Sequence, residues 1–354
     1  MIKRRKAKIV SIGGVKIGGR YPIAVQSMCN TDTRDAKATV KQIRALEEAG
    51  CEIVRVAVPD MQAAEAVSEI KKRIHIPLVA DIHFQYLLAL ECAKRGADKL
   101  RINPGNIGSA ENTKAVVKEA KRRKIPIRIG VNSGSIERKL LEKYGYPTPE
   151  AAVESALNHI KILEDLDFAD IVVAIKFSDT TKTIEANRIL APKCSYPLHL
   201  GVTEAGPPKI GSIKSAIGIG SLLYDGIGDT IRVSLTGDPV EEVKVGYEIL
   251  KDLGIRSHGP MLTACPTCGR TEVDLVKMVG KVEEVLKEIK KPIKVAVMGC
   301  AVNGPGEAKE SDIAVVGGKR MGAIFVRGKV VASLPEEKMY QRLLEEIAKF
   351  EVDA

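Results

Sequence analysis

Three cysteines and a glutamate toward the carboxyl-terminal end of the sequence have the types and spacing of metal ligands. Cys265 and Cys268 form a CxxC motif, in which a tight turn can bring two thiolates to one centre. Cys300 ends the apolar run KVAVMGC and would complete a face of three sulfurs. A fourth ligand is still needed. Glu307, in the segment CAVNGPGE, is the nearest strong candidate, because the glycines and proline before it can turn the chain back.

Three kinds of centre remain open for these residues. A structural zinc site normally has four nitrogen or sulfur ligands, so it would need His258, whose position before the CxxC motif fits no familiar spacing. A redox-active dithiol would leave Cys300 unexplained. An iron–sulfur cluster with three thiolates and one oxygen ligand uses all four residues, and a weakly held carboxylate could give way to a substrate.

A second set of polar residues interrupts or ends the apolar runs between residues 22 and 235. Parallel strands that are buried on both faces should be almost entirely apolar. Five cations depart from that expectation, namely Arg55, Arg101, Arg128, Lys176 and Arg232. Other polar residues at or just past the ends of the runs are His83, Asn103, Asn132, His199, Thr203 and Glu204.

The apolar runs themselves predict the scaffold that positions these residues. They alternate with stretches of helical periodicity, and the length involved approaches the ~250 residues typical of a (β/α)8 TIM barrel. A doubly wound open sheet is the alternative, although no GxGxxG motif follows the first run. The runs are PIAVQSM (22–28), EIVRVAV (52–58), PLVADI (77–82), KLRI (99–102), PIRIGV (126–131), DIVVAIK (170–176), PLHLGV (197–202) and TIRVSL (230–235).

In a barrel, the carboxyl-terminal ends of the strands meet at one mouth, where active sites are built. Five cations there would form a pocket for an anion that carries more than one phosphate. The alternative is that each cation is paired with an acid on a neighbouring strand. The segment KIVSIGGVKIGG (8–19) predicts a β-hairpin before the barrel. We therefore expect a first domain over 1–254, with this hairpin at its start.

The pattern changes after IRSHGP (255–260), which has the composition of a linker. A helix is predicted over about 272–290, followed by the strand KVAVMGC, a loop at AVNGPGEA, further short strands and a final helix. This pattern predicts a small α+β domain over 261–354 that carries the cysteine motifs.

Composition narrows the classes of partner and compartment. Lysine and arginine total 55 against 45 aspartates and glutamates, and the net charge of +10 favours anionic partners. Only 4% of the residues are aromatic, which argues against a protein that stacks nucleic-acid bases. No apolar run reaches the ~18 residues of a membrane span, and no secretory signal follows the basic start. We therefore expect no nucleic acid or membrane partner and a reducing, cytoplasmic location.

The motifs together resemble a known family over essentially the whole chain. ACPTCGR and MGCAVNGPGE, after VQSMCNTDT, VADIHF, LRINPGN, IRIGVNSGS and LHLGVTEAG, are similar to those of the IspG (GcpE) family of 4-hydroxy-3-methylbut-2-enyl diphosphate synthases. The paired cysteine motifs are highly specific. The chain has no room for the extra domain that some members insert between barrel and cluster domain, so it resembles the two-domain bacterial form.

The resemblance implies a TIM barrel joined to an α+β domain with a [4Fe-4S] cluster. It implies an oxidoreductase of the methylerythritol phosphate route to isoprenoids. The substrate would be 2-C-methyl-D-erythritol 2,4-cyclodiphosphate, reduced by two electrons with ring opening and loss of water to 4-hydroxy-3-methylbut-2-enyl diphosphate. The electrons would come singly from reduced flavodoxin or ferredoxin.

The resemblance also implies roles for the residues already singled out. Cys265, Cys268, Cys300 and Glu307 match the cluster ligands, and the five cations match the diphosphate-binding positions. We expect His83, Asn103, Asn132 and Thr203 to join them in the substrate site. Glu204 matches the carboxylate near the reacting carbons, where it or, less favoured, His83 would act as general acid. The alternative for Glu204 is a salt bridge to a cation of the pocket.

The predicted topology further suggests a homodimer. The last barrel helix should end at the face opposite the mouth, so the cluster domain would more simply cap the barrel of a second copy, as the resemblance also implies. Two other functions remain open from the residues alone: a zinc-containing, basic nucleic-acid-binding protein, and a barrel enzyme acting on phosphate esters with a structural metal domain.

Overall fold

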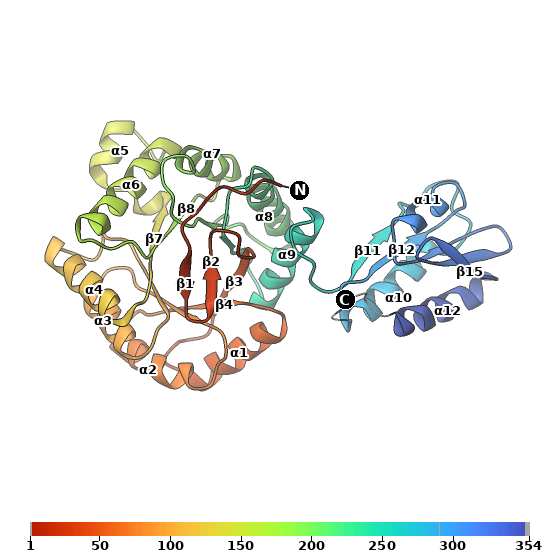
Figure 1. The fold of residues 1–354 in the computed structure, drawn as a ribbon, viewed down its shortest axis with the longest axis horizontal. Helices are drawn as coiled ribbons and strands as arrows, with labels where there is room; N and C mark the ends of the chain where they lie inside the picture. Colours follow the sequence, from red (N-terminus) through yellow and green to blue (C-terminus); the bar gives the residue numbers. More distant parts are fainter. Residues whose placement is uncertain (1, 290, 351–354) are drawn as a thin grey trace. The chain divides into compact units, whose positions relative to one another are not determined.

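The computed structural model describes residues 2–289 and 291–350, and the chain divides into two compact units between Arg256 and Ser257 (Figure 1). The division falls within the segment IRSHGP. Each unit has a hydrophobic core of its own, so each is described by itself.

The first unit is a barrel of parallel strands, and the prediction of a TIM barrel is confirmed. The strands follow the order β8-β7-β6-β5-β4-β3-β10-β9, and a parallel bridge between Val173 and Leu198 joins the two ends of this order. The open-sheet alternative is therefore wrong. The strands are β3 (Ala24–Met28), β4 (Ile53–Ala57), β5 (Leu78–Asp81), β6 (Lys99–Ile102), β7 (Ile127–Asn132), β8 (Ile171–Lys176), β9 (His199–Leu200) and β10 (Thr230–Ile231).

The helices form the outer layer around these strands (Figure 1). Many begin at a residue whose side chain accepts a backbone N–H of the first turn, as Asp35, Asp60, Thr148 and Asp179 do. Their apolar faces share one core with the outward-facing strand residues. The helices are α1 (Ala36–Glu48), α2 (Met61–Lys71), α3 (Tyr86–Lys94), α4 (Ala110–Arg123), α5 (Arg138–Tyr144), α6 (Pro149–Asp165), α7 (Thr180–Leu190), α8 (Pro208–Tyr224), α9 (Pro239–Asp252) and the 3-10 turn η1 (Ser133–Ser135).

The hairpin predicted before the barrel is present as β1 (Val10–Ile12) and β2 (Val15–Ile17), paired antiparallel. Its apolar side chains form a separate small core with Ala24, Ile53, Val79 and Val172, which lie near the starts of their strands. The hairpin therefore closes the amino-terminal end of the barrel and leaves the carboxyl-terminal end as the mouth.

The second unit is a five-stranded sheet with the order β11-β12-β13-β14-β15, in which the first three strands are parallel and the last two antiparallel. Helices α10 and α12 pack in one core cluster of the unit, and α11 packs in another through Ala308. The elements are β11 (Met261–Ala264), α10 (Leu275–Lys287), β12 (Lys294–Met298), α11 (Gly304–Lys309), β13 (Ile313–Val316), β14 (Gly322–Val326), β15 (Lys329–Leu334) and α12 (Glu336–Lys349).

One local prediction for this unit is wrong. The segment AVNGPGEA was expected to be a loop, but the helix α11 begins within it at Gly304. Pro305 sits in the first turn of this helix, where its missing N–H costs nothing and its fixed backbone angle favours the helix. Glu307 is therefore held on a helix rather than on a loop.

Candidate active site and metal ligands

The five cations of the sequence analysis line one pocket at the mouth of the barrel. Each comes from a different strand or its end, because residues that alternate along a strand face the barrel interior. The same pocket contains three more of the predicted substrate-site residues, His83, Asn132 and Thr203. The complete lining is Arg55, His83, Arg101, Arg128, Gly130, Asn132, Ala174, Lys176, Thr203, Arg232 and Ser234.

Two glycines make space for the cations. A Cβ atom at Gly130 would lie 2.5 Å from Nε of Arg101, and one at Gly201 would lie 2.5 Å from Nζ of Lys176. Such distances are far below van der Waals contact, so any larger residue would displace the cation. The pocket is thus shaped around its charged side chains.

The charges of the pocket are only partly compensated. Asp81 at the end of β5 lies 3.3 Å from both Arg55 and Arg101, and Glu242 on α9 lies 3.2 Å from Arg232. Among the described residues, Arg128 and Lys176 form no ion pair. The alternative of cations paired with neighbouring acids therefore applies to three of the five. Five cations against two carboxylates leave an excess of three positive charges.

Burial makes this excess energetically important. Arg128 is 1% exposed and Lys176 is 7% exposed. Burial, followed by the repulsion of neighbouring cations, lowers the pKa of both groups well below their ordinary values. Burial likewise lowers the pKa of Arg55 to about 10, although Asp81 opposes the change. A polyanion in the pocket would relieve this repulsion.

His199 is a buried residue that contacts Lys176 of the pocket. Its Nε2 lies 3.2 Å from Nζ of Lys176, and its Nδ1 lies 2.6 Å from the hydroxyl of Thr230. Burial and the nearby cations Lys176 and Arg128 lower the pKa of His199 well below its ordinary value. The charged form of the imidazole is therefore disfavoured, and its two ring nitrogens join Lys176 to Thr230.

Asn103 and Glu204 differ from the other predicted residues. Asn103 is buried, and its side chain accepts from the N–H of Gly105 and donates to the carbonyl of Ser135, so it holds the loop after β6 rather than lining the pocket. Glu204 is exposed in the loop after β9, next to Thr203. Its φ of 53° is left-handed, which costs a non-glycine residue roughly 1–2 kcal/mol. Strain of this kind concentrates at functional sites.

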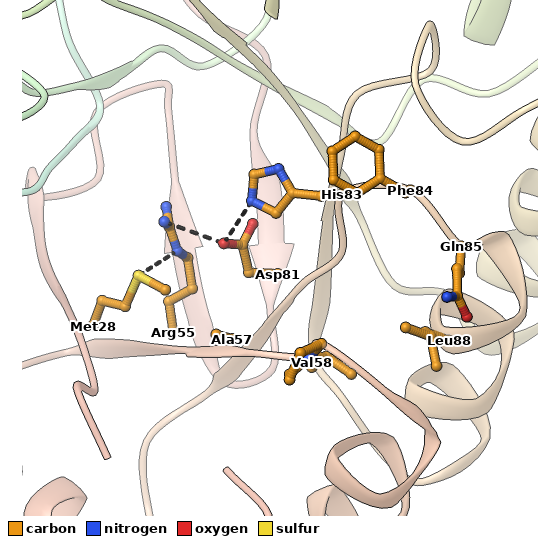
Figure 2. A pocket seen from close by; sticks show the side chains of 10 residues that line it. Met28, Arg55, Ala57, Val58, Asp81, His83, Phe84, Gln85 and Leu88 are labelled. Carbon is orange, nitrogen blue, oxygen red and sulfur yellow. Dashed lines mark hydrogen bonds and ion pairs between the residues drawn. The ribbon is translucent and has the colours of Figure 1, made fainter. Parts of the chain in front are cut away.

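A second pocket adjoins the first at Arg55 and His83 (Figure 2). On its polar side, Nε of Arg55 contacts the sulfur of Met28 at 2.9 Å, and the Asp81 carboxylate lies 3.4 Å from Nε2 of His83. Its other side is apolar, with Val58, Phe84 and Leu88. The mouth therefore offers an anion pocket beside a less polar recess.

Asp81 and Glu242 belong to the site but were not among the residues predicted for it. Asp81 had a signal, because a carboxylate in the buried run PLVADI needs a cationic partner. Glu242 had none, because it lies on a helix that reaches Arg232 only in the folded barrel.

In the second unit, the predicted metal ligands lie toward one edge of the sheet. Cys265 follows β11 and Cys300 follows β12, and these strands are parallel neighbours with Ala264 opposite Val297. The N–H of Gly299 donates to Sγ of Cys265 at 3.1 Å. Hydrogen bonds of this kind also tune the sulfur ligands of iron–sulfur clusters.

Cys268 and Glu307 are both exposed, Cys268 beyond the turn that follows β11 and Glu307 in the first turn of α11. Within residues 2–289 and 291–350, however, no three His, Cys, Asp or Glu side chains are close enough together to hold a metal ion. The donors thus share an edge of the sheet without being gathered around a common point.

The donor set nevertheless fits an iron–sulfur cluster better than the alternatives. His258 precedes β11 and Cys265 follows it, and an extended strand of four residues separates its ends by roughly 13 Å. A Cys3His zinc site is therefore disfavoured. The accessible thiols also contrast with Cys29, Cys51 and Cys92, which are buried in the barrel and whose pKa values burial raises to about 12.

Two models of known protein families match most of the chain. The family model described as the GcpE TIM-barrel domain matches residues 7–247, and the GcpE protein C-terminal domain matches residues 261–349. No helix in the described part of the chain is long and apolar enough to cross a membrane.

Curated relatives match over nearly the full length of both chains. Proteins named 4-hydroxy-3-methylbut-2-en-1-yl diphosphate synthase (flavodoxin) from Thermodesulfovibrio yellowstonii and Caldanaerobacter subterraneus are 59% and 60% identical. These matches cover 99% of this chain and 100% and 99% of the relatives.

Solved structures show the fold at much lower identity. Dihydropteroate synthases from Yersinia pestis and Stenotrophomonas maltophilia superpose with TM-scores of 0.51 and 0.53 at 13% identity, covering 70% of this chain and 97% of each of theirs. This likeness supports the barrel alone. The two family models and the full-length relatives show more: the chain belongs to the GcpE family.

Proposed function

We propose that this protein catalyses the reductive ring opening and dehydration of 2-C-methyl-D-erythritol 2,4-cyclodiphosphate to 4-hydroxy-3-methylbut-2-enyl diphosphate. The names of the full-length relatives support this reaction. The observation that carries it in the structure is the pocket of five cations with two compensating carboxylates. A cyclic diphosphate brings two negative charges to that excess of positive charge.

The barrel residues would bind and orient this substrate. Arg128 and Lys176 have no carboxylate partner among the described residues, so they are the strongest anchors for phosphate oxygens. Arg55 and Arg101 lie on the strands on either side of Asp81 and pair with it. The side of each guanidinium that faces away from Asp81 would contact the ligand. The recess with Val58, Phe84 and Leu88 offers the carbon skeleton a less polar surface. Thr203 and Asn132 add neutral polar groups.

Cys265, Cys268, Cys300 and Glu307 would hold a [4Fe-4S] cluster. When bound, such a cluster supplies low-potential electrons and a Lewis-acidic iron. Glu307 is exposed on α11, and a carboxylate binds cluster iron more weakly than a thiolate does. Glu307 would therefore be the ligand that a substrate oxygen can replace. The Gly299 N–H that reaches Cys265 would stabilise that thiolate.

The departing hydroxyl group needs a proton, and Glu204 is the group that we assign to this step. It is exposed beside Thr203 of the pocket and is held in a strained conformation. His83 is the weaker candidate, because its ring already contacts Asp81 and Arg101.

Flavodoxin, which the relatives' names include, is the favoured donor, and ferredoxin is the second. Flavodoxins are acidic, and the net charge of +10 suits their docking. A reducing cytoplasm suits the seven free cysteines of the described chain.

The test is anaerobic purification followed by iron and sulfide analysis and an assay with the cyclic diphosphate. We expect about four irons and four sulfides per chain, visible absorption, and turnover that requires reduced flavodoxin or ferredoxin. Stoichiometric zinc without sulfide, or turnover of the cyclic diphosphate without an electron donor, would contradict the proposal.

We further propose that the active unit is a homodimer in which the cluster domain of one copy caps the barrel of the other. The chain leaves the barrel at the end opposite the mouth. Arg256, the last residue of the first unit, donates to the carbonyl of Ile23 and pairs with Glu52 at 2.7 Å, and these two residues precede β3 and β4. Only residues 257–260 then precede β11.

An exposed apolar stripe on α8 supports a contact with a second copy. Ile210, Ile213 and Ile217 recur at helical spacing and are 50%, 53% and 53% exposed. Covering such a stripe with the same stripe of another copy gives the closed twofold symmetry of a dimer. Ile213→Asp should therefore shift the protein toward monomer in sedimentation or size-exclusion measurements.

Mixing two inactive variants tests the shared site. Cys300→Ser removes a cluster ligand and Glu204→Gln removes the proton donor, and a mixed dimer still contains one site with both halves intact. We expect partial recovery of activity after subunit exchange. No recovery, with exchange demonstrated by mass spectrometry, would show that each chain completes its own site.

A further inference from the structure

A layer of polar side chains lies between the hairpin that closes the barrel and the anion pocket at its mouth. These residues alternate along their strands with residues of the outer core, so they face inward. They are Gln26 on β3, Lys99 on β6, Arg128 on β7, His199 on β9 and Thr230 on β10, and none is more than 1% exposed.

Lys99 and Gln26 are the members of this layer whose side-chain polar atoms all lack a hydrogen-bond partner among the described residues, and Lys99 is the titratable one. It is 0% exposed, and its Nζ has no hydrogen-bond partner among the described residues. Two nitrogens of Arg128, Nε and Nη1, are likewise without a partner there. Lys99 is not part of the lining of the pocket, so it lies behind Arg128 rather than in contact with a ligand.

An ammonium in this position is unfavourable in the free protein. Burial is the main reason, and the charges of Arg128 and Arg55 add to it, so the pKa of Lys99 lies well below its ordinary value. The alternative is that Lys99 is neutral with or without a ligand and only packs the barrel interior. That interpretation does not explain why the amine is on the inward face next to the pocket whose charge must change when a ligand binds.

Arg128, Arg55 and His199 act on Lys99 directly, and the barrel interior around the pocket contains further groups of both signs. The charged and titratable groups are Arg55 on β4, Asp81 on β5, Arg101 on β6, Arg128 on β7, Lys176 on β8, His199 on β9, Arg232 beyond β10 and Glu242 on α9. Only Asp81 and Glu242 are acidic, and both already pair with arginines. The net charge around Lys99 is therefore positive when no anion is bound in the pocket.

We propose that Lys99 takes up a proton from solvent when a diphosphate fills the pocket, so that it acts as a positioning residue that matches the charge of the barrel interior to that of the ligand. This inference rests on the proposed function, because it needs an anionic ligand in this pocket. Two ligand charges next to Arg128 would offset the repulsion from Arg128 and Arg55, which adds to burial in disfavouring the charged form of Lys99.

The sign of the pH dependence follows from linkage. The bound state holds the proton more tightly than the free state, so affinity is highest at low pH and falls as pH rises through the higher, ligand-bound pKa. Between the two pKa values, one coupled proton weakens binding by up to about tenfold per pH unit. The cyclic diphosphate does not confuse this measurement, because each of its phosphorus atoms carries one strongly acidic group that stays ionised near neutral pH.

Isothermal titration calorimetry tests the proposal with the full-length, anaerobically prepared protein and the cyclic diphosphate, without electron donor. We expect the binding heat to differ between Tris and Hepes at the same pH, in the sense of proton uptake by the complex. We also expect the affinity to fall as pH rises. If heat is released equally in both buffers, this inference is wrong although the proposed function stands. If the cyclic diphosphate does not bind at all, the proposed function itself fails.

Two variants locate the proton. Lys99→Met keeps the length of the side chain and should lose the buffer-dependent heat and flatten the pH dependence. Its unfolding temperature should not fall, because it removes an unpartnered buried amine. His199→Asn is the control, since His199 is the other neutral base of the layer. Uptake that persists in Lys99→Met would overturn the assignment to Lys99, whether or not it disappears in His199→Asn.

Discussion

The mouth of the barrel and the cysteine edge of the second unit are built in opposite ways. At the mouth, five cations from different strands already surround one pocket, and Gly130 and Gly201 leave the space that two of them occupy. At the sheet edge, Cys268 and Glu307 are exposed, and the described residues form no metal-binding group.

The difference shows what each site depends on. The cations are fixed by the alternation of strands in a barrel, which the core enforces with or without ligand. The thiols lie on turns at strand ends, so their geometry would be completed by the cluster that we propose they hold. Metal and cluster binding is coupled to local folding in this way. The anion pocket should therefore form whether or not the cluster is present. The four cluster ligands, in contrast, should reach their final positions only when the cluster is bound.

The largest expected effect separates the two regions directly. Cys265→Ser, Cys268→Ser or Cys300→Ser should abolish turnover and most of the bound iron, because each removes one of three thiolates. Binding of the cyclic diphosphate to the barrel should remain measurable by calorimetry. Full activity in any of these variants would exclude the cluster assignment, and complete loss of ligand binding would show that the pocket is not independent.

Glu204→Gln should produce the next largest effect. If Glu204 supplies the proton, the catalytic rate constant should fall by about 10²–10⁴-fold, while the dissociation constant of the cyclic diphosphate changes little. Steady-state kinetics and calorimetry check the two parts separately. Glu204 would instead be a structural partner of the cations if only binding were lost.

Arg128→Ala should mainly weaken binding. A charge-assisted hydrogen bond contributes about 1.5–3 kcal/mol, which corresponds to a roughly ten- to hundredfold rise in the dissociation constant. Arg122→Ala on the solvent face of α4 is the matched control, because Arg122 is 61% exposed and, in the described part of the chain, its ion pair is with Glu119 on the same helix. Equal affinities for the two variants would move the substrate site away from this pocket.

The smallest effect concerns the loops that follow β6 and β7 at the mouth. Burial alone would raise the pKa of Glu137, but its interactions with His159, together with contributions from Ser155 and a backbone N–H, outweigh burial and lower the pKa to about 2. Since this pKa is lower when folded, the stabilisation is present above the ordinary glutamate pKa and is lost as pH falls toward 2.

Glu137→Gln should therefore cost about 1 kcal/mol at neutral pH, a fall of roughly 2–4 °C in the unfolding temperature. The cost should shrink in acid. The exposed Glu142→Gln on the same helix serves as control, since its partner Arg138 is 91% exposed. A difference between the variants that persists unchanged at pH 3 would contradict the role of this pair.

The sequence predicted the barrel well because its strands are short apolar runs separated by helical periodicity. β9 and β10 are shorter than their runs, only His199–Leu200 and Thr230–Ile231. Near them, Gly201 comes close to the backbone of Arg232 and to Lys176, an approach that depends on tertiary packing. The helix α11 was missed because glycine and proline in AVNGPGEA usually indicate a turn.

Site residues could be predicted where a polar side chain interrupts an apolar strand. The cations stood out in apolar runs, and Lys99 could have been found too, because it lies two residues before Arg101 and hence on the same face of β6. Asn103 looked equivalent to its neighbours, but its side chain is used by the local loop. Glu242 could not be found, because its contact with Arg232 joins a helix to a strand end in three dimensions.

The closed amino-terminal end of the barrel has a kinetic consequence. The hairpin β1–β2 fills that end, and Arg4 and Arg5 near the amino terminus pair with Asp229 beside it. With that end filled, the mouth is the route into the anion pocket. Reactant and product must use that opening in turn, so each should compete with the other for the free protein. If a cluster domain covers the mouth as we propose, its opening would also limit how quickly product can leave.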